Sequence, residues 1–139
     1  MVFSILVSND DDHLRSHGFL RDPRLAGWRL SPLYNVVPRP GIATERFLHL
    51  QVGKQGKLAT LDNALSRYAE FNLDLTDATT TMARLVHQVS QWNSVFEELK
   101  VPGRLIDMLA PTFRKLDEIA GVGLKKALLE QPKSKPRRT

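Results

Sequence analysis

Helical spacing of apolar residues from Thr60 onward most constrains what this chain can fold into. Apolar residues recur there at the i, i+3, i+4, i+7 spacing of one helix face. The first such set comprises Leu61, Ala64, Leu65, Tyr68 and Ala69. Because Thr60 is a favourable N-cap and Asn72 a suitable left-handed stop, the pattern predicts an amphipathic helix that starts at Leu61.

A longer apolar stripe follows and predicts a second helix from about Asp77 to Leu99, with Thr76 as its N-cap. The stripe consists of Ala78, Met82, Leu85, Val86, Val89, Trp92 and Phe96. Met82 and Trp92 are therefore expected to be core residues. A buried tryptophan at position 92 would cost roughly 3–5 kcal/mol of stability when truncated to alanine.

Proline and glycine divide the remaining C-terminal part of the chain. Pro102 suits the first turn of a third helix, which Pro111 interrupts. That helix would carry Leu105, Ile106 and Leu109, and a further helical start would carry Phe113, Leu116, Ile119 and Ala120. The residues G121-V-G123 predict a break after it, and residues 133–139 have the composition of a disordered basic end.

The N-terminal part has a different pattern. Residues 2–7 form a short apolar run that suits either a buried strand or a helix, because periodicity cannot separate the two at this length. Residues 17–21 and 28–31 flank a Pro/Gly turn and predict a β-hairpin. Three prolines in residues 32–41 predict an extended loop, since each lacks an N–H and disfavours helix before it.

These elements predict a mainly α fold with a short β-hairpin at its N-terminal end. A length of 139 residues and a hydrophobic content of 42% suit one domain with its own core. The chain contains no cysteine, which excludes disulfides and thiolate metal sites. It has no apolar run of membrane-spanning length, so we expect a cytoplasmic protein.

The formal net charge of +5 is confined to the C-terminal end. Residues 125–139 hold six Lys or Arg and one Glu, so residues 1–124 carry fourteen positive and fourteen negative charges. We therefore expect a domain over residues 1–124 and a basic tail over residues 125–139. The tail has no interleaved aromatic residues, so it would contact DNA phosphates weakly and without sequence preference, or serve only to solubilise the protein.

The stretch N9-D-D-D-H-L-R-S-H-G18 concentrates ionisable side chains. An acidic triplet alone is usually a solvated loop. Here it precedes a hairpin, an extended loop and a helical block, which is the order of elements in phosphotransferases. A kinase catalytic loop places its base Asp five positions before a metal-binding Asn, and Asp11 and Ser16 have this spacing. Asn35 follows the hairpin, where a second metal-binding acid would stand.

Three segments resemble the HipA family of bacterial serine/threonine kinase toxins, namely S8-N-D-D-D-H-L-R-S-H-G-F-L20, G27-W-R-L-S-P-L-Y-N-V-V-P38 and L61-D-N-A-L-S66. The resemblance extends over most of residues 2–113 and corresponds to the C-terminal lobe of such a kinase. It implies a kinase-like helical lobe and a place in a type II toxin–antitoxin system. The nucleotide-binding N-terminal lobe of the family has no counterpart in this sequence, and a separately encoded lobe is one partner that would complete the kinase.

The resemblance also implies roles for individual residues. Asp11 corresponds to the catalytic base, Ser16 replaces a metal-binding Asn, and Asn35 replaces a metal-binding Asp. The residues that would support the loop are His13, Arg15 and His17. ATP and Mg²⁺ are the family's cofactors, but Mg²⁺ binds weakly where carboxylates are few. We therefore expect this chain alone to bind neither of them tightly, with the aspartates that flank Asp11 as substitute ligands.

Other motifs are weaker. His13 and His17 are four residues apart and would suit Zn²⁺ on a helix, but a glycine follows them and no Glu base lies between them. The segment G53-K-Q-G-K57 imitates a phosphate loop, yet its glycines are three apart where that motif needs five, so a turn is expected. His49 and His87 are isolated and expected to be structural.

Two functions fit this sequence. In the first, the chain is the C-terminal lobe of a HipA-like kinase, inactive alone, in which Asp11 is the base toward a protein serine once an N-terminal lobe supplies ATP. In the second, the chain is a non-catalytic pseudokinase module that binds a partner, such as an antitoxin-like DNA-binding protein. The intact Asp11 favours the first function, whereas Ser16 and Asn35 favour the second.

Overall fold

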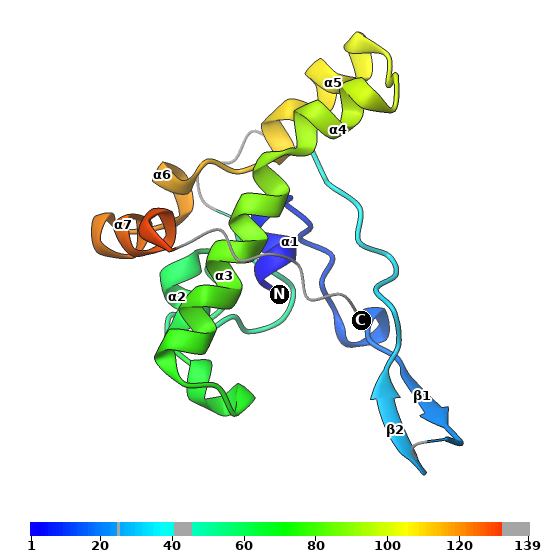
Figure 1. Ribbon diagram of the computed structural model, residues 1–139, viewed down its shortest axis with the longest axis vertical. Coiled ribbons are helices and arrows are strands. Elements are labelled where there is room, and N and C mark those ends of the chain that lie inside the picture. The colour runs from blue at the N-terminus through cyan, green and yellow to red at the C-terminus, as the bar shows by residue number, and fades with distance from the viewer. Residues whose placement is uncertain (25, 41–45, 132–139) are drawn as a thin grey trace.

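The structure is a computed structural model that describes residues 1–24, 26–40 and 46–131 (Figure 1). In chain order its elements are α1 (Val2–Leu6), the 3₁₀ turn η1 (Leu14–Ser16), β1 (Phe19–Asp22), β2 (Gly27–Leu30), α2 (Leu61–Leu65), the 3₁₀ turn η2 (Tyr68–Phe71), α3 (Leu75–Ser90), α4 (Trp92–Glu98), α5 (Gly103–Leu109), the 3₁₀ turn η3 (Ala110–Thr112), α6 (Leu116–Ile119) and α7 (Val122–Glu130). The predicted fold class, mainly α with a short hairpin, is confirmed. No helix within the described ranges is long and apolar enough to cross a membrane.

The hydrophobic core joins the two ends of the chain around α3. Helix α3 packs against α1 and α7, and α1 also contacts α2. Figure 1 shows α3 as the long central helix of this group. Ile5 of α1, Leu61 of α2 and Ile119 of α6 are each 1% exposed or less. The run at residues 2–7, which suited a strand or a helix, is thus the short helix α1, and this helix and its C-cap residue contribute Ile5, Leu6 and Val7 to the core.

The predicted hairpin is confirmed, and it extends from the helical body at the lower right of Figure 1. Its strands are antiparallel, with Phe19 opposite Leu30. Its large side chains face solvent, since Phe19 is 65% exposed and Trp28 is 71% exposed. The described residues that follow, 32–40, contain neither helix nor strand, as the prolines predict.

The predicted ends of the first amphipathic helix are confirmed, but the helix between them is divided. The Thr60 hydroxyl accepts a hydrogen bond from the Asn63 N–H, and Asn72 adopts a left-handed conformation with φ 54°. Helix α2 nevertheless ends at Leu65, and the chain continues as the 3₁₀ turn η2. At this end the Ser66 hydroxyl donates to the Asn63 carbonyl at 2.6 Å, which competes with the backbone hydrogen bonds of a continuing helix.

The helix predicted from Asp77 to Leu99 is wrong in its start and in its continuity. Helix α3 starts at Leu75, because the Asp74 carboxylate accepts the Asp77 N–H at 2.7 Å and acts as the N-cap in place of Thr76. The chain then breaks at Gln91, and α4 begins at Trp92. Just before this break the Ser90 hydroxyl donates to the His87 carbonyl at 2.8 Å. A local side-chain bond of this kind weakens the backbone ladder of a helix end.

Met82 is buried, as predicted, but Trp92 is only half-buried. The Trp92 ring stacks on Phe113, with 4.3 Å between ring centroids and 2° between ring planes. Phe96 packs edge-on against both rings. Trp92 therefore belongs to an aromatic cluster at the edge of the core, so the stability range of a fully buried tryptophan does not apply to it.

The C-terminal elements follow the predicted order but end in an additional helix. Pro102 precedes α5 as its N-cap, and the turn η3 contains Pro111. The break predicted at residues 121–123 is only partly present, because Gly121 is the N-cap of α7 and Gly123 lies inside that helix. Helix α7 spans the predicted domain boundary after residue 124, and residues 133–139 lie outside the described residues.

Candidate functional site: the acidic loop

The acidic loop, residues 9–17, is a tight turn held by its own first side chain. Ser8 has a left-handed φ of 55°, which reverses the chain at the end of α1. The Asn9 carboxamide oxygen then accepts the Asp11 N–H at 3.2 Å, and the Asp11 carbonyl accepts the His13 N–H at 3.1 Å. The turn η1 follows directly. These bonds curl the backbone of residues 10–12 into a turn. The three carboxylates therefore point in different directions and contact different partners.

The three carboxylates differ in exposure and in partner. Asp10 lies at the surface and accepts a hydrogen bond from Arg39 at 3.0 Å. Asp12 is 6% exposed, with His17 Nε2 3.6 Å from its Oδ1 and the Met1 amino group 3.5 Å from its Oδ2. Asp11 has 43% of its side chain exposed, and His13 is its only ion-pair partner among the described residues. The triplet therefore combines a buried acid with two accessible ones.

Arg39 is the cation nearest to the exposed face of the loop. Its hydrogen bond to Asp10, together with the charges of Asp10 and Asp11, raises the pKa of the Arg39 guanidinium above its ordinary value. The guanidinium is fully exposed to solvent, so its raised pKa shows that the surrounding charge is negative, but the ion pair adds little to the stability of the fold.

His13 and His17, which are predicted to support the loop, contact its carboxylates and its backbone. His13 lies between two predicted site positions, because its Nε2 is 3.5 Å from Asp11 Oδ1 and its Nδ1 is 3.2 Å from the Ser16 hydroxyl. His17 Nδ1 lies 3.2 Å from the His13 carbonyl oxygen. Arg15 takes part through its backbone, whose carbonyl accepts the Tyr34 hydroxyl at 2.8 Å.

Asn35 meets Ser16 although the two are 19 residues apart, because the antiparallel hairpin between them brings its two flanking segments together. The Asn35 amide nitrogen lies 3.3 Å from the Ser16 hydroxyl, and the Asn35 carbonyl oxygen lies 3.5 Å from the Asn9 amide nitrogen. Asn35 itself is left-handed, with φ 55°, a conformation that asparagine adopts more readily than most residues. The two positions predicted as metal ligands are thus brought together as a hydrogen-bonded pair.

The arrangement fits Mg²⁺ poorly. The ion prefers several oxygen ligands in octahedral geometry, with one or two carboxylates among them. Here Ser16 and Asn35 are uncharged and hydrogen-bonded to each other, so the Asp11 carboxylate is the single charged group of the predicted set. Within the described ranges no group of three or more His, Asp or Glu side chains is arranged to hold a metal ion. His13 and His17 each face a different aspartate, which is not the geometry of a shared zinc site.

The residues 53–57 form a turn in which the N–H groups of residues 53–56 already have hydrogen-bond partners. Gly53 and Gly56 form a bridge, and Gly56 has a left-handed φ of 67°. The Lys54 N–H donates to the Ser66 hydroxyl at 2.9 Å, and the Gln55 N–H donates to the Asn63 side chain at 2.8 Å. A phosphate loop offers its amides to phosphate oxygens instead, so the expected turn is confirmed.

Sequence reasoning missed the residues that fix the base of the loop. The Ser8 hydroxyl donates to the carbonyl of fully buried Thr112 at 2.8 Å, and the Arg114 N–H donates to the Leu6 carbonyl at 2.9 Å. A separation of more than 100 residues leaves no local pattern that could reveal these bonds. Asn9 had such a signal, since asparagine before a turn commonly bonds the backbone two residues onward.

Comparison with known proteins shows the family to which these residues belong. No curated protein and no solved structure matches the chain. One family model, described as the HipA-like C-terminal domain, matches residues 1–94. The matched residues include the acidic loop, the hairpin, Asn35 and all of α3. Since the match covers well over half of the sequence, this chain belongs to the HipA-like C-terminal domain family.

Proposed function

We propose that this chain is the catalytic-loop lobe of a HipA-like serine/threonine kinase and that it is inactive without a nucleotide-binding lobe. The observation that carries the proposal is the contact between Ser16 and Asn35, with His13 linking Ser16 to Asp11. Kinase metal ligands have the same spacing relative to the base, so the convergence of these positions supports the alignment with a kinase loop.

Asp11 is the group best placed to act as the base. Its carboxylate is accessible, and His13 holds it at the outer side of the loop. In the reaction a protein serine gives its hydroxyl proton to Asp11, and its oxygen bonds to the γ-phosphorus of ATP as the bond to the β–γ bridging oxygen breaks. A separate lobe would hold the nucleotide in line, a positioning effect that can be worth about 7–11 kcal/mol.

The first test is nucleotide binding by the chain alone. We expect calorimetry with millimolar ATP and Mg²⁺ to show no saturable isotherm, because Ser16 and Asn35 are bonded to each other and the proposed site has one carboxylate. A clear isotherm that disappears in Asp11→Ala would contradict this expectation. Asp10 and Asp12 would then be the residues to test as replacement ligands.

The second test restores the two ligand types with Ser16→Asn and Asn35→Asp. The second substitution returns a formal charge to the position beside Ser16, so the double variant should bind Mn²⁺ and broaden the resonances around Asp11. Asn72→Asp is the matched control, because Asn72 is also exposed, also left-handed at φ 54°, and far from the loop in sequence. If the double variant binds no more Mn²⁺ than this control, the loop is not a kinase metal loop.

The test of catalysis needs a nucleotide-binding lobe of the family added in trans. With such a lobe the double variant should transfer phosphate to a protein serine, and Asp11→Asn should reduce the rate by about 10²–10⁴. Transfer that is indifferent to Asp11→Asn would refute the role of this residue as the base.

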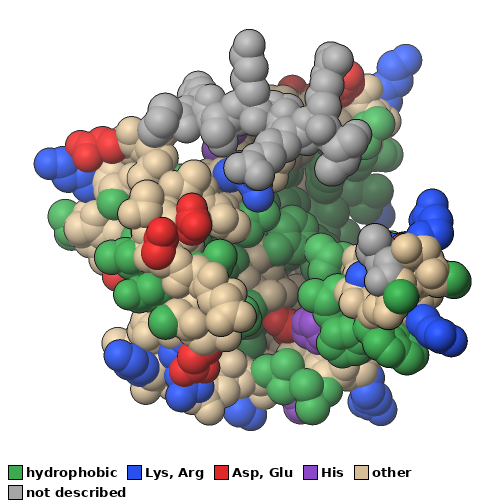
Figure 2. All heavy atoms as spheres, turned by 60° about the horizontal axis from the view of Figure 1, so that its bottom comes forward, with side chains coloured by type: hydrophobic (Ala, Val, Ile, Leu, Met, Phe, Trp, Pro, Cys, Tyr) green, Lys and Arg blue, Asp and Glu red, His purple; other side chains and the backbone are tan. Residues whose placement is uncertain are grey.

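A second candidate function is a non-catalytic module that binds an antitoxin-like DNA-binding protein. It is favoured by the exposed apolar side chains of the hairpin, including Trp28 at 71% and Leu30 at 61%. Figure 2 shows hydrophobic side chains beside Lys and Arg on the projecting hairpin, at the right of the view. Trp28→Ser should then weaken the complex while Asp11→Asn leaves it unchanged, as measured by calorimetry with the purified partner. The reverse pattern would remove this candidate.

A further inference from the structure

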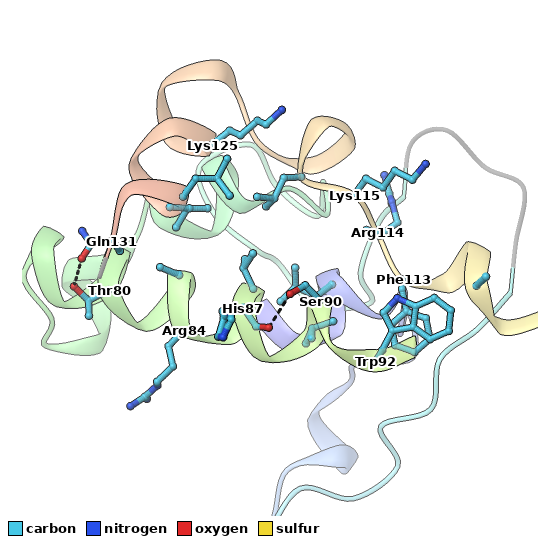
Figure 3. A pocket seen from close by; sticks show the side chains of 18 residues that line it. Thr80, Arg84, His87, Ser90, Trp92, Phe113, Arg114, Lys115, Lys125 and Gln131 are labelled. Atoms are coloured by element: carbon cyan, nitrogen blue, oxygen red, sulfur yellow. Dashed lines mark hydrogen bonds between the residues drawn. The ribbon is translucent and has the colours of Figure 1, made fainter. Parts of the chain in front are cut away.

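A cavity of about 670 Å³ lies on the opposite side of α1 from the acidic loop (Figure 3). It is enclosed by α3, α7 and the segment from Ala110 to Leu116. Its apolar wall includes Leu6, Ala83, Val86, Val89 and Leu128. A volume of this order is typical of small-molecule sites, which range from about 300 to 1,000 Å³.

The two ends of the cavity differ in chemistry. At one end the stacked rings of Trp92 and Phe113 form an aromatic surface. At the other end the Thr80 hydroxyl donates to the Gln131 side-chain oxygen at 3.4 Å, which joins α3 to the residue that follows α7. An elongated apolar body would therefore lie along α3 between an aromatic end and a polar end.

Arg114 supplies the observation that points to a ligand. Its side chain is only 6% exposed, and its Nε donates to Glu118 at 2.8 Å. Its Nη1, however, is buried and has no hydrogen-bond partner. Buried donors are almost always satisfied, and leaving a charged one unpaired is costly. Figure 3 shows Arg114 at the aromatic end of the cavity, so an anion there would satisfy this nitrogen.

The electrostatics around Arg114 favour an anion as well. The described residues that line the cavity include no Asp or Glu. Lys115 stands beside Arg114 at the same end and forms no ion pair with any described residue. Lys125 also lines the cavity, but it is paired with Asp117. Arg84 lines the cavity too, but nearer Thr80 than the aromatic rings (Figure 3), so Arg114 and Lys115 are the two cations at the aromatic end.

We infer that the cavity binds an amphiphilic anion, whose apolar body lies between α3 and α7 and whose carboxylate or phosphate group bonds Arg114 Nη1 and Lys115. The site shares no side chain with the acidic loop, so the inference does not depend on the proposed kinase role. Charge-assisted bonds to a guanidinium are about twice as strong as neutral ones, which would make the head group decisive for affinity.

Fluorescence of Trp92 gives a direct assay, since its ring forms one end of the cavity. The chain has two tryptophans, and exposed Trp28 can be replaced by Trp28→Phe to leave Trp92 as the reporter. The probes are monomeric decanoate, decyl phosphate and neutral decanol. We expect a saturable change in emission with at least one of the two anions, at least about tenfold tighter than with decanol. The tighter anion identifies the head group.

Arg114→Met should weaken binding of the better anion at least about tenfold and leave decanol binding unchanged. Lys115→Gln provides a second variant on an exposed side chain, in case the first fails to fold, and should weaken the anion in a salt-dependent way. Lys126→Gln is the matched control, because Lys126 loses the same charge on α7 but does not line the cavity. Equal affinity in Arg114→Met and its parent would overturn the inference, as would binding to phosphatidylglycerol vesicles without any response to the free anions.

Discussion

Replacing Asn63 with alanine should destabilise this fold by about 2–4 kcal/mol, although Asn63 lies outside the acidic loop. Asn63 is 1% exposed and links α2 to the turn at residues 53–58. Its side-chain oxygen accepts the Gln55 N–H at 2.8 Å, and its amide nitrogen donates to the Gly56 and Leu58 carbonyls at 3.1 and 2.8 Å. Alanine would leave three backbone groups without these partners, at roughly 1 kcal/mol each, plus a small cavity.

Urea denaturation followed by circular dichroism measures this loss. With a slope of about 2 kcal/mol per molar urea, the middle of the usual range for small proteins, the expected change lowers the midpoint by roughly 1–2 M. Asn63→Asp separates hydrogen bonding from cavity formation, because it keeps the volume and the acceptor but loses both donors. We expect Asn63→Asp to cost at least as much as alanine, since it also places a carboxyl group against two carbonyl oxygens.

Asn93→Ala is the matched control for Asn63→Ala. Asn93 also makes a side-chain bond, to Glu97 at 2.7 Å, but this bond is exposed to solvent, so its loss should stay within about 0.5 kcal/mol. A cost below about 1 kcal/mol for Asn63→Ala would refute the reasoning, because it would mean that water replaces the three bonds at no cost.

Three further stability predictions follow from burial and contact, each measured by the urea midpoint. Gly53→Ala should cost at least about 2 kcal/mol, because an added Cβ would lie 1.9 Å from the Asn63 carbonyl oxygen; a neutral result would mean that the turn moves freely. Trp92→Ala should cost about 2–3 kcal/mol, below the range for a fully buried ring, because half-buried Trp92 keeps mainly its stack on Phe113. Trp28→Ser should change stability by less than about 0.5 kcal/mol, and a larger loss would place this ring in a packed environment.

Local signals predicted the element ends well. The Thr60 cap, the left-handed Asn72 and the hairpin each depend on a few neighbouring residues, and all are present in the structure. The prediction of Thr76 as the cap of α3 was wrong, because Asp74, two residues earlier, is also a capping residue type and accepts the Asp77 N–H.

Local sequence patterns did not predict two helix boundaries, and contacts between distant parts of the chain determine one of them. Helix α7 forms past Gly121 because the Gly121 N–H is held by the Asp62 carboxylate at 2.7 Å and the helix packs on α3, so two glycines do not end the structure there. A one-residue break at Gln91 likewise leaves the apolar period intact while it moves Trp92 out of the core. Periodicity describes which face is apolar, but not where a helix is interrupted.

In the candidate site, spacing along the chain located the residues but not their bonds. The loop positions and Asn35 were predicted from a kinase pattern, and the structure brings Asn35 to Ser16. Their roles as base and metal positions remain predictions. The orientation of the Asn35 amide toward Ser16, and the attachment of Ser8 to Thr112, depend on the folded backbone and have no sequence signal.

The hairpin that extends from the helical body has a kinetic consequence. Two isolated strands are marginally stable in water, and here β1 and β2 are held mainly by each other and by the Ser31–Gly18 bond at their base. Their amides should therefore exchange with deuterium through local opening, at a rate that is independent of the global stability that protects Ile5 and Leu61. A partner that covers the strands would slow amide exchange in β1 and β2 and leave exchange in the helical core unchanged. The exchange rates of these two strands would therefore show directly whether the partner is bound.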